Sequence, residues 1–249
     1  MQYLKLKNIN LDFIKYKNNH NTLKENILKY LLNFGKNYYK KEVFTVLHKV
    51  SFELETGDRL VIIGKNGAGK SSLLRILVDI YKPTSGSIEK KGTITSLLEV
   101  GAGMNPELTG RENIMLSSLI SGFSKKKIES KMNEIINFAD IGDFIDVPMK
   151  YYSSGMCYRL SFSTAILVEP EILIVDELFA GGDVNFINKA SNRIEELKNT
   201  ASIFISVSHD MAYAKKFFNK ILYLKDNHIE YFGENIDHGI DLYLKNSVI

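Results

Sequence analysis

The stretch Gly64-Lys65-Asn66-Gly67-Ala68-Gly69-Lys70-Ser71 decides the fold of this 249-residue chain. It fits the pattern G-x-x-x-x-G-K-[ST], in which glycines let successive backbone N–H groups turn toward phosphate oxygens. The apolar run 60–63 before it predicts a buried strand, and residues 72–77 after it predict a helix whose N-terminus favours an anion. A nucleoside triphosphate is therefore the expected ligand, and the motif alone does not distinguish ATP from GTP.

Within this loop, each residue type has an expected task. Lys70 is expected to reach the β- and γ-phosphates, and the Ser71 hydroxyl is expected to ligate Mg²⁺. The residues expected to contact the nucleotide here are Gly64, Asn66, Gly67, Ala68, Gly69, Lys70, Ser71 and Ser72.

Two further apolar runs end in polar residues that suit phosphate chemistry. Residues 171–175 predict a buried strand followed by Asp176 and Glu177, and residues 201–207 predict another strand followed by His209 a little beyond its end. We expect Asp176 to hold Mg²⁺, Glu177 to polarise an attacking water, and His209 to contact the γ-phosphate or that water. Alone, a strand ending in Asp-Glu is more often a surface strand end; the phosphate loop 106 residues upstream makes the catalytic interpretation strong.

Composition excludes several protein classes. With 45% apolar residues, the chain can bury a core as one large domain or two small ones. Its one cysteine, Cys157, allows neither an internal disulfide nor a cysteine zinc cluster, which fits a reducing compartment such as the cytoplasm. No apolar run approaches a membrane span, and the first residues lack the apolar core of a signal peptide, so a soluble or peripheral protein is expected.

Charge is distributed unevenly along the chain. The net charge is +3, but residues 1–50 hold ten of the 32 basic residues and only three of the 29 acids. The remainder is mildly acidic, whereas a dedicated nucleic-acid binder is more often basic throughout. We therefore expect no nucleic-acid partner.

The sequence Tyr152-Ser153-Ser154-Gly155-Met156, followed by an expected helix over 157–167, resembles the signature motif of the ATP-binding cassette (ABC) family. Unaided, Ser-Ser-Gly before a helix predicts only an N-cap. Between the phosphate loop and Asp-Glu, it makes the chain similar to ABC nucleotide-binding subunits over nearly its whole length. The resemblance implies that Ser153, Ser154 and Gly155 bind the γ-phosphate of ATP held by a second copy, and that Asp183 crosses the interface of a homodimer.

Two family positions transfer less directly. Where the family has a loop glutamine that contacts Mg²⁺ and water, residues 97–106 contain no Gln, and Glu99 is the expected substitute. A carboxylate can ligate Mg²⁺ but cannot donate the amide hydrogen bond. The resemblance also implies an aromatic residue that stacks on adenine before the strand 46–54. Phe44 is the first choice and Tyr39 the second, and a core position for either remains open.

Residues 99–113, the Tyr-Ser-Ser-Gly-Met segment and the run from Asp176 to Asp183 together resemble one branch of the family, which exports lipid-linked polysaccharides of O-antigen, capsule or teichoic acid type. The resemblance implies an ATPase that works with a polytopic transmembrane permease, through which a lipid-linked glycan moves. It also implies a peripheral position on the cytoplasmic face of the inner membrane. We expect no C-terminal carbohydrate-binding domain.

Residues 21–41 carry an amphipathic pattern in the basic part of the chain. Apolar side chains recur at helical spacing from Leu23 to Phe34, a capping box begins at Thr22, and Gly35 suits the helix end. By pattern, such a helix fits an anionic membrane surface and an ordinary packed helix about equally. The branch resemblance, which implies an inserted helix near the membrane, favours contact with membrane, permease or substrate headgroup.

We therefore expect one α/β domain over 1–249 with the P-loop ABC ATPase fold. Strands near 3–14, 46–54 and 87–98 are predicted to form an antiparallel part, strands near 59–63, 171–176 and 202–207 a parallel core, and residues 104–166 a helical subdomain. Helices are expected over 112–121, 125–140 and 236–244. Three alternatives stay open: an ABC ATPase energising export of another substrate, a soluble non-transport ABC ATPase, and a nucleotide-gated subunit with little hydrolysis.

Overall fold

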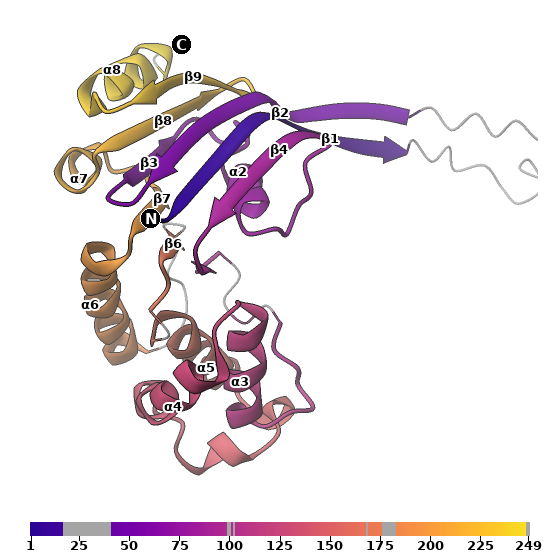
Figure 1. Cartoon of the computed structure of the whole chain (residues 1–249), viewed down its shortest axis with the longest axis vertical. Coiled ribbons are helices and arrows are strands. Elements are labelled where there is room, and N and C mark those ends of the chain that lie inside the picture. The colour runs from indigo at the N-terminus through magenta and orange to yellow at the C-terminus, as the bar shows by residue number, and fades with distance from the viewer. Residues whose placement is uncertain (17–40, 99–100, 102, 168, 176–182, 248–249) are drawn as a thin grey trace, which may run out of the picture.

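The structure, a computed structural model, describes residues 1–16, 41–98, 101, 103–167, 169–175 and 183–247. Two sheets and a group of helices make up this part of the chain (Figure 1). The first sheet is antiparallel and has the strand order β2-β1-β4, from β1 (Tyr3–Tyr16), β2 (Lys41–Glu55) and β4 (Ser85–Lys91). The Tyr16 end of β1 and the Lys41 end of β2 extend away from the body as two paired strands.

The second sheet has six strands in the order β5-β6-β7-β3-β8-β9. Its parallel part contains β5 (Ile94–Ser96), β6 (Ile172–Val175), β7 (Ile203–Val207), β3 (Arg59–Ile63) and β8 (Lys220–Lys225), and β9 (His228–Gly233) pairs antiparallel with β8. β7 lies directly beside β3, so the carboxyl ends of these two strands meet at one sheet edge. The expected parallel core is confirmed.

The expected single strand over 87–98 is wrong. Residues 85–91 form β4 in the antiparallel sheet, whereas residues 94–96 form β5 in the other sheet, parallel to β6. Gly92 stands between them with a φ of +131°, a conformation that residues with a side chain rarely adopt. The chain therefore changes sheets at Gly92.

Helix α2 (Lys70–Leu77) packs between the two sheets. The side chains of β3 show that the six-stranded sheet is covered on both faces. Leu60 and Ile62 join the apolar cluster that contains α2, β1 and β2. Val61 and Ile63 join a second cluster on the opposite face, shared with the remaining helices. Because successive side chains of a strand point to opposite faces, an unbroken apolar run suits a strand that is covered on both sides.

A helical group lies at the far end of the molecule from α8 (Figure 1). It consists of α3 (Gly110–Ile120), α4 (Lys125–Ala139) and α5 (Ser154–Leu167), joined by the 3₁₀ helices Gly142–Asp146 and Met149–Tyr151. Thr109 and Glu112 form a reciprocal capping box at the start of α3. The other helices are α6 (Val184–Thr200), α7 (Met211–Phe217) and α8 (Ile236–Ser247).

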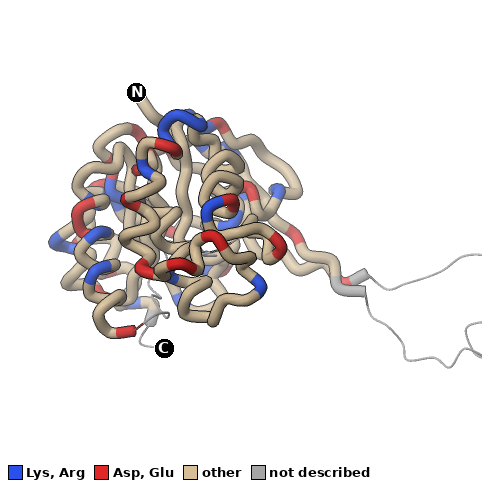
Figure 2. The backbone as a smooth tube through the Cα atoms, turned by 90° about the horizontal axis from the view of Figure 1, so that it is seen from below, with Lys and Arg blue, Asp and Glu red and all other residues tan. Residues whose placement is uncertain are grey.

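Acidic and basic residues alternate over the described body without a continuous region of one sign (Figure 2). Near the N-terminus, Lys5 pairs with Glu53 and Lys7 with Glu89 across strands. Five of the ten lysines of the basic N-terminal part fall in 17–40, and with them most of the predicted amphipathic helix lies outside the described residues. No helix of the described residues combines the length and apolarity needed to cross a membrane.

Candidate functional site

The phosphate loop joins the carboxyl end of β3 to α2, as the sequence predicts. Gly69 occupies the N-cap position of α2 in the left-handed conformation and provides no side-chain cap. The N–H groups of the first helical turn therefore have no side-chain acceptor at the cap. Together with the helix dipole, they make this end of α2 attractive to an anion.

Lys70 is a buried lysine, only 7% exposed, in the first turn of α2. Its Nζ donates to the carbonyl oxygens of Gly64 and Lys65, at 2.6 and 3.1 Å. The side chain therefore lies folded back over the loop that it follows. This places a positive charge among the loop's backbone groups, where a phosphate oxygen can exchange for a carbonyl.

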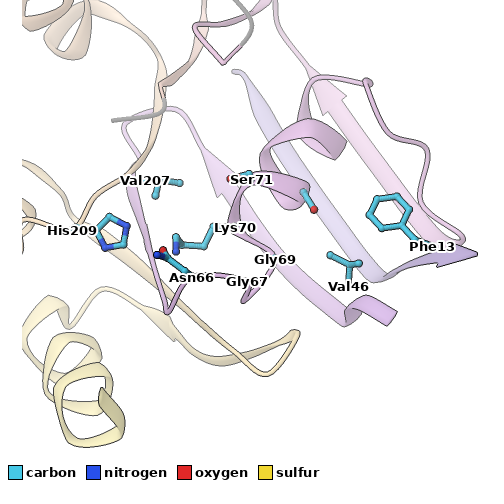
Figure 3. Close-up of a pocket in the computed structure, with 10 residues that line it drawn as sticks. Phe13, Val46, Asn66, Gly67, Gly69, Lys70, Ser71, Val207 and His209 are labelled. Atoms are coloured by element: carbon cyan, nitrogen blue, oxygen red, sulfur yellow. The ribbon is translucent and has the colours of Figure 1, made fainter. Parts of the chain in front are cut away.

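A cavity of about 590 Å³ opens beside this loop. Most of its wall consists of residues that the sequence predicts: Asn66, Gly67, Gly69, Lys70, Ser71, Ser72 and His209. His209 follows β7, and its presence in the wall results from the β3–β7 pairing. Figure 3 shows His209 at one end of the cavity and Phe13 at the other, with Lys70 between them.

Phe13 and Val46 also line the cavity, and the sequence analysis missed both. Phe44, the aromatic residue predicted to stack on adenine, is not part of the wall. The β1–β2 register pairs Phe44 with Phe13, and the two rings are 49% and 41% exposed. The structure therefore places Phe13 in the cavity wall and Phe44 outside it, and the stacking of Phe44 on adenine stays a prediction. Tyr39 lies outside the described residues.

Other predicted residues lie away from this cavity. Gly64 and Ala68 belong to the loop but do not line the wall. Ser153 and Ser154 are exposed at the start of α5, where the Ser153 hydroxyl accepts the N–H of Met156 at 3.2 Å as an N-cap. The helix begins at Ser154, three residues before its expected start, and Gly155 is its second residue.

Asp183 is the N-cap of α6, and its carboxylate accepts the N–H of Phe186 at 3.0 Å. This hydrogen bond holds the pKa of Asp183 below its ordinary value, and the guanidinium of Arg159, 3.6 Å away, adds to the effect. Arg159 belongs to α5, so an ion pair joins the start of α6 to the helix that begins within the Tyr-Ser-Ser-Gly-Met segment. Glu99, Asp176 and Glu177 lie outside the described residues.

Comparison with known proteins identifies the family. A model of the ABC transporter family matches residues 47–180. This chain belongs to the ABC transporter family. The match includes the phosphate loop, the Tyr-Ser-Ser-Gly-Met segment and the Asp-Glu pair, and the family makes the chain an ABC-type ATPase.

Several curated relatives are similar over most of this chain. It is 39% identical over 239 residues to the O-antigen export system ATP-binding protein RfbE of Yersinia enterocolitica, covering 95% of this chain and 99% of the relative. It is 38% identical over 204 residues to RfbB of Klebsiella pneumoniae, an O-antigen export system ATP-binding protein, covering 82% of each. The teichoic acids export ATP-binding protein TagH of Shouchella clausii is 37% identical over 229 residues, covering 92% of this chain and 62% of the relative.

Solved structures support the fold. A dimeric ATP-binding cassette in a post-hydrolysis state with ADP and phosphate matches with a TM-score of 0.63 at 20% identity, covering 93% of this chain and 98% of the other. The ATP-binding subunit of an ABC transporter matches with a TM-score of 0.66 at 22% identity, covering 96% and 94%. The predicted P-loop ABC ATPase fold is confirmed.

Proposed function

We propose that this protein is the ATP-hydrolysing subunit of an ABC exporter that moves a lipid-linked polysaccharide across the cytoplasmic membrane. The observation that carries the ATPase part is the cavity in which Lys70, Ser71 and His209 meet at the ends of β3 and β7. The export of polysaccharide is supported by RfbE, an O-antigen export system ATP-binding protein whose match covers 95% of this chain and 99% of the relative. O-antigen, capsule and teichoic acid types are all included in the proposal.

In this proposal, the chain's own groups bind the triphosphate at the start of α2. Lys70 exchanges its bonds to the Gly64 and Lys65 carbonyls for bonds to the β- and γ-phosphates. The backbone N–H groups of the loop and the first turn of α2 donate to the remaining phosphate oxygens. The Phe13 ring stacks on the adenine at the other end of the cavity.

Mg²⁺ fits the donor groups of this site. The Ser71 hydroxyl lies in the cavity wall, and Asp176 follows β6 in the sequence; hydroxyl and carboxylate oxygens are the ligands that Mg²⁺ prefers beside phosphates. When bound, the ion neutralises negative charge on the phosphate oxygens. We propose Glu177 as the group that polarises the attacking water, with His209 supporting the γ-phosphate and Glu99 acting in the loop that usually carries Gln.

A second copy of the chain completes each nucleotide site in this proposal. Ser153, Ser154 and Gly155 lie at the N-terminus of α5, outside the cavity of their own chain, and both serines are exposed. A helix N-terminus with exposed hydroxyls suits the γ-phosphate of ATP bound to a partner copy. Asp183, exposed at the start of α6, is proposed to lie at the same interface.

Closure and reopening of this dimer would drive a polytopic permease on the cytoplasmic face of the inner membrane. We assign residues 21–41, with their basic and amphipathic sequence, to the membrane-proximal side, where they contact lipid, permease or the substrate headgroup. Neutralising their lysines is expected to weaken coupling to transport more than ATP binding.

The test combines turnover, binding and transport. Glu177→Gln keeps the size of the side chain but removes its basic oxygen, so ATP turnover should fall by at least about a hundredfold while ATP affinity stays within about twofold. The assay is phosphate release with the full chain and its permease, together with equilibrium binding of ATP. Glu129→Gln, on the exposed surface of α4, is the matched control. Near-normal turnover in Glu177→Gln would refute the role of Glu177, and activity of the protein in the cell without any membrane partner would refute the exporter.

A further inference from the structure

The ring of Phe13 has an aromatic neighbour that does not line the nucleotide cavity. Tyr81 approaches it with ring centroids 5.5 Å apart and planes at 83°, the edge-to-face arrangement that aromatic pairs favour. Phe13 lines the cavity, whereas Tyr81 does not. The tyrosine therefore contacts the ring without being part of the cavity wall that a base would approach.

Tyr81 is fixed to the C-terminal end of α2 through Arg75. The Tyr81 N–H donates to the carbonyl oxygen of Arg75 at 3.1 Å, and the Ile80 N–H donates to the same oxygen at 2.9 Å. The Arg75 guanidinium lies 5.7 Å from the centroid of the Tyr81 ring, within the range of a cation–π contact. Arg75 thus holds both the backbone and the ring of Tyr81.

The chain after Tyr81 is bound to β1 immediately before Phe13. The Thr84 N–H donates to the carbonyl oxygen of Asn10 at 2.7 Å, and the Thr84 hydroxyl accepts the N–H of Asp12 at 2.8 Å. The segment 81–84 therefore connects α2 to the part of β1 that carries Phe13. Both the strand and the ring are held from α2.

We propose that Tyr81 is a positioning residue for Phe13. Helix α2 would then bind the phosphates at its first turn and, from its last turn through Tyr81, orient the ring that stacks on the base. The inference rests on the proposed nucleotide function of the cavity. An aromatic ring that is 41% exposed has freedom to lose when a base stacks on it. Tyr81 restricts that freedom before binding, and such preorganisation lowers the cost of association.

The experiment compares ADP with inorganic pyrophosphate, which has the same phosphates and no base. Isothermal titration of the full chain measures both ligands in the presence of Mg²⁺. Tyr81→Ala should weaken ADP binding about fivefold and leave pyrophosphate within about twofold. Tyr81→Phe keeps the ring edge and should bind ADP like the wild type.

A double-mutant cycle shows whether Tyr81 acts through Phe13. Phe13→Ala alone should weaken ADP about tenfold, because it removes the stacking surface. In that background, Tyr81→Ala should cause no further loss. Ile80→Ala, in the same turn and 42% exposed, is the matched control and should bind ADP normally.

Two results would overturn the inference. One is an unchanged ADP affinity in Tyr81→Ala; the other is an equal loss of ADP and pyrophosphate affinity, which would show a general distortion of α2. If Tyr81→Ala does not fold, as judged by thermal unfolding, Tyr81→Leu retains the bulk and should give the same selective loss. A wild-type chain that binds neither ligand would instead refute the proposed function itself, and the inference with it.

Discussion

Two glycines of the phosphate loop give a matched test of how tightly the loop packs against β2. Gly67 and Gly69 both have left-handed backbones, with φ of +83° and +99°. A Cβ on Gly67 would meet nothing within 4 Å, whereas a Cβ on Gly69 would lie 2.7 Å from the Val46 carbonyl oxygen and 2.8 Å from Leu47 Cδ2. Alanine at Gly69 therefore adds a collision that alanine at Gly67 does not.

The magnitude follows from these two contributions. A left-handed alanine costs about 1–2 kcal/mol in either variant. Leu47 is fully buried, and forcing extra volume into a packed core costs about 1–3 kcal/mol more. The free energy of unfolding should thus fall by about 1–2 kcal/mol in Gly67→Ala and by about 2–5 kcal/mol in Gly69→Ala. In a chain of this size, the difference corresponds to about 2–12 °C in Tm.

The measurement is thermal and urea unfolding of both variants and the wild type, without nucleotide, so that lost phosphate contacts do not enter the comparison. The urea midpoint should fall further for Gly69→Ala, and the slope of the transition should stay unchanged. A Gly67→Ala variant that is as unstable as Gly69→Ala, or more so, would refute the reasoning. Backbone strain alone would then explain both losses, and the contact between the loop and β2 would contribute nothing.

Three further variants test other parts of the structure. The Glu171 carboxylate accepts the N–H of Thr93, and this hydrogen bond holds the pKa of Glu171 below the ordinary 4.5. The ionised carboxylate therefore stabilises the fold fully above pH 4.5, and this stabilisation is lost as the pH falls through the folded-state pKa. Glu171→Gln should therefore lower Tm by about 2–6 °C at pH 7, with the gap to wild type narrowing as the pH falls below 4.5 in a pH series of thermal scans; a constant gap contradicts this. Lys198 is buried, and its ammonium contacts the Tyr213 hydroxyl and the rings of Tyr213 and Phe217. Lys198→Met should therefore lower the urea midpoint, whereas Lys216→Met, at an exposed position, should not. Ser153→Ala removes the N-cap of α5 and should lower the free energy of unfolding by about 1 kcal/mol. It should also lower ATP turnover of the dimer more than ATP affinity of one chain, and equal losses of turnover and affinity would argue against a role across the interface.

The phosphate site could be predicted because its signals are local. The glycine pattern, the apolar run that forms β3 and the helix that follows all lie within residues 60–77, so periodicity and spacing suffice. His209 needed one further step, the expectation that β7 and β3 belong to one parallel core, and the observed pairing bears it out. The helix α5 shows the limit of local reasoning, because the helix is expected from the sequence over 157–167, whereas the Ser153 cap begins it at Ser154.

Features that depend on pairing between distant strands could not be read in this way. The sequence predicts one strand over 87–98, whereas Gly92, with its left-handed backbone, and Thr93 separate β4 from β5, which join different sheets.

The choice between Phe13 and Phe44 also depends on contacts between distant segments. The β1–β2 pairing shifts three times between Leu6 and Asp12, and beyond the last shift Phe13 and Phe44 lie directly opposite each other. A pattern of apolar residues cannot count these shifts, because each depends on what the strand packs against. Phe13 is instead selected by its neighbours: the Asn10 carbonyl, the Asp12 amide and the Phe13 ring all contact the segment that leaves α2. Helix α2 therefore determines both ends of the cavity: the phosphate end directly, and the Phe13 end through the segment that follows the helix. This contact joins β1 to a segment far away in the sequence, and the sequence alone does not reveal it.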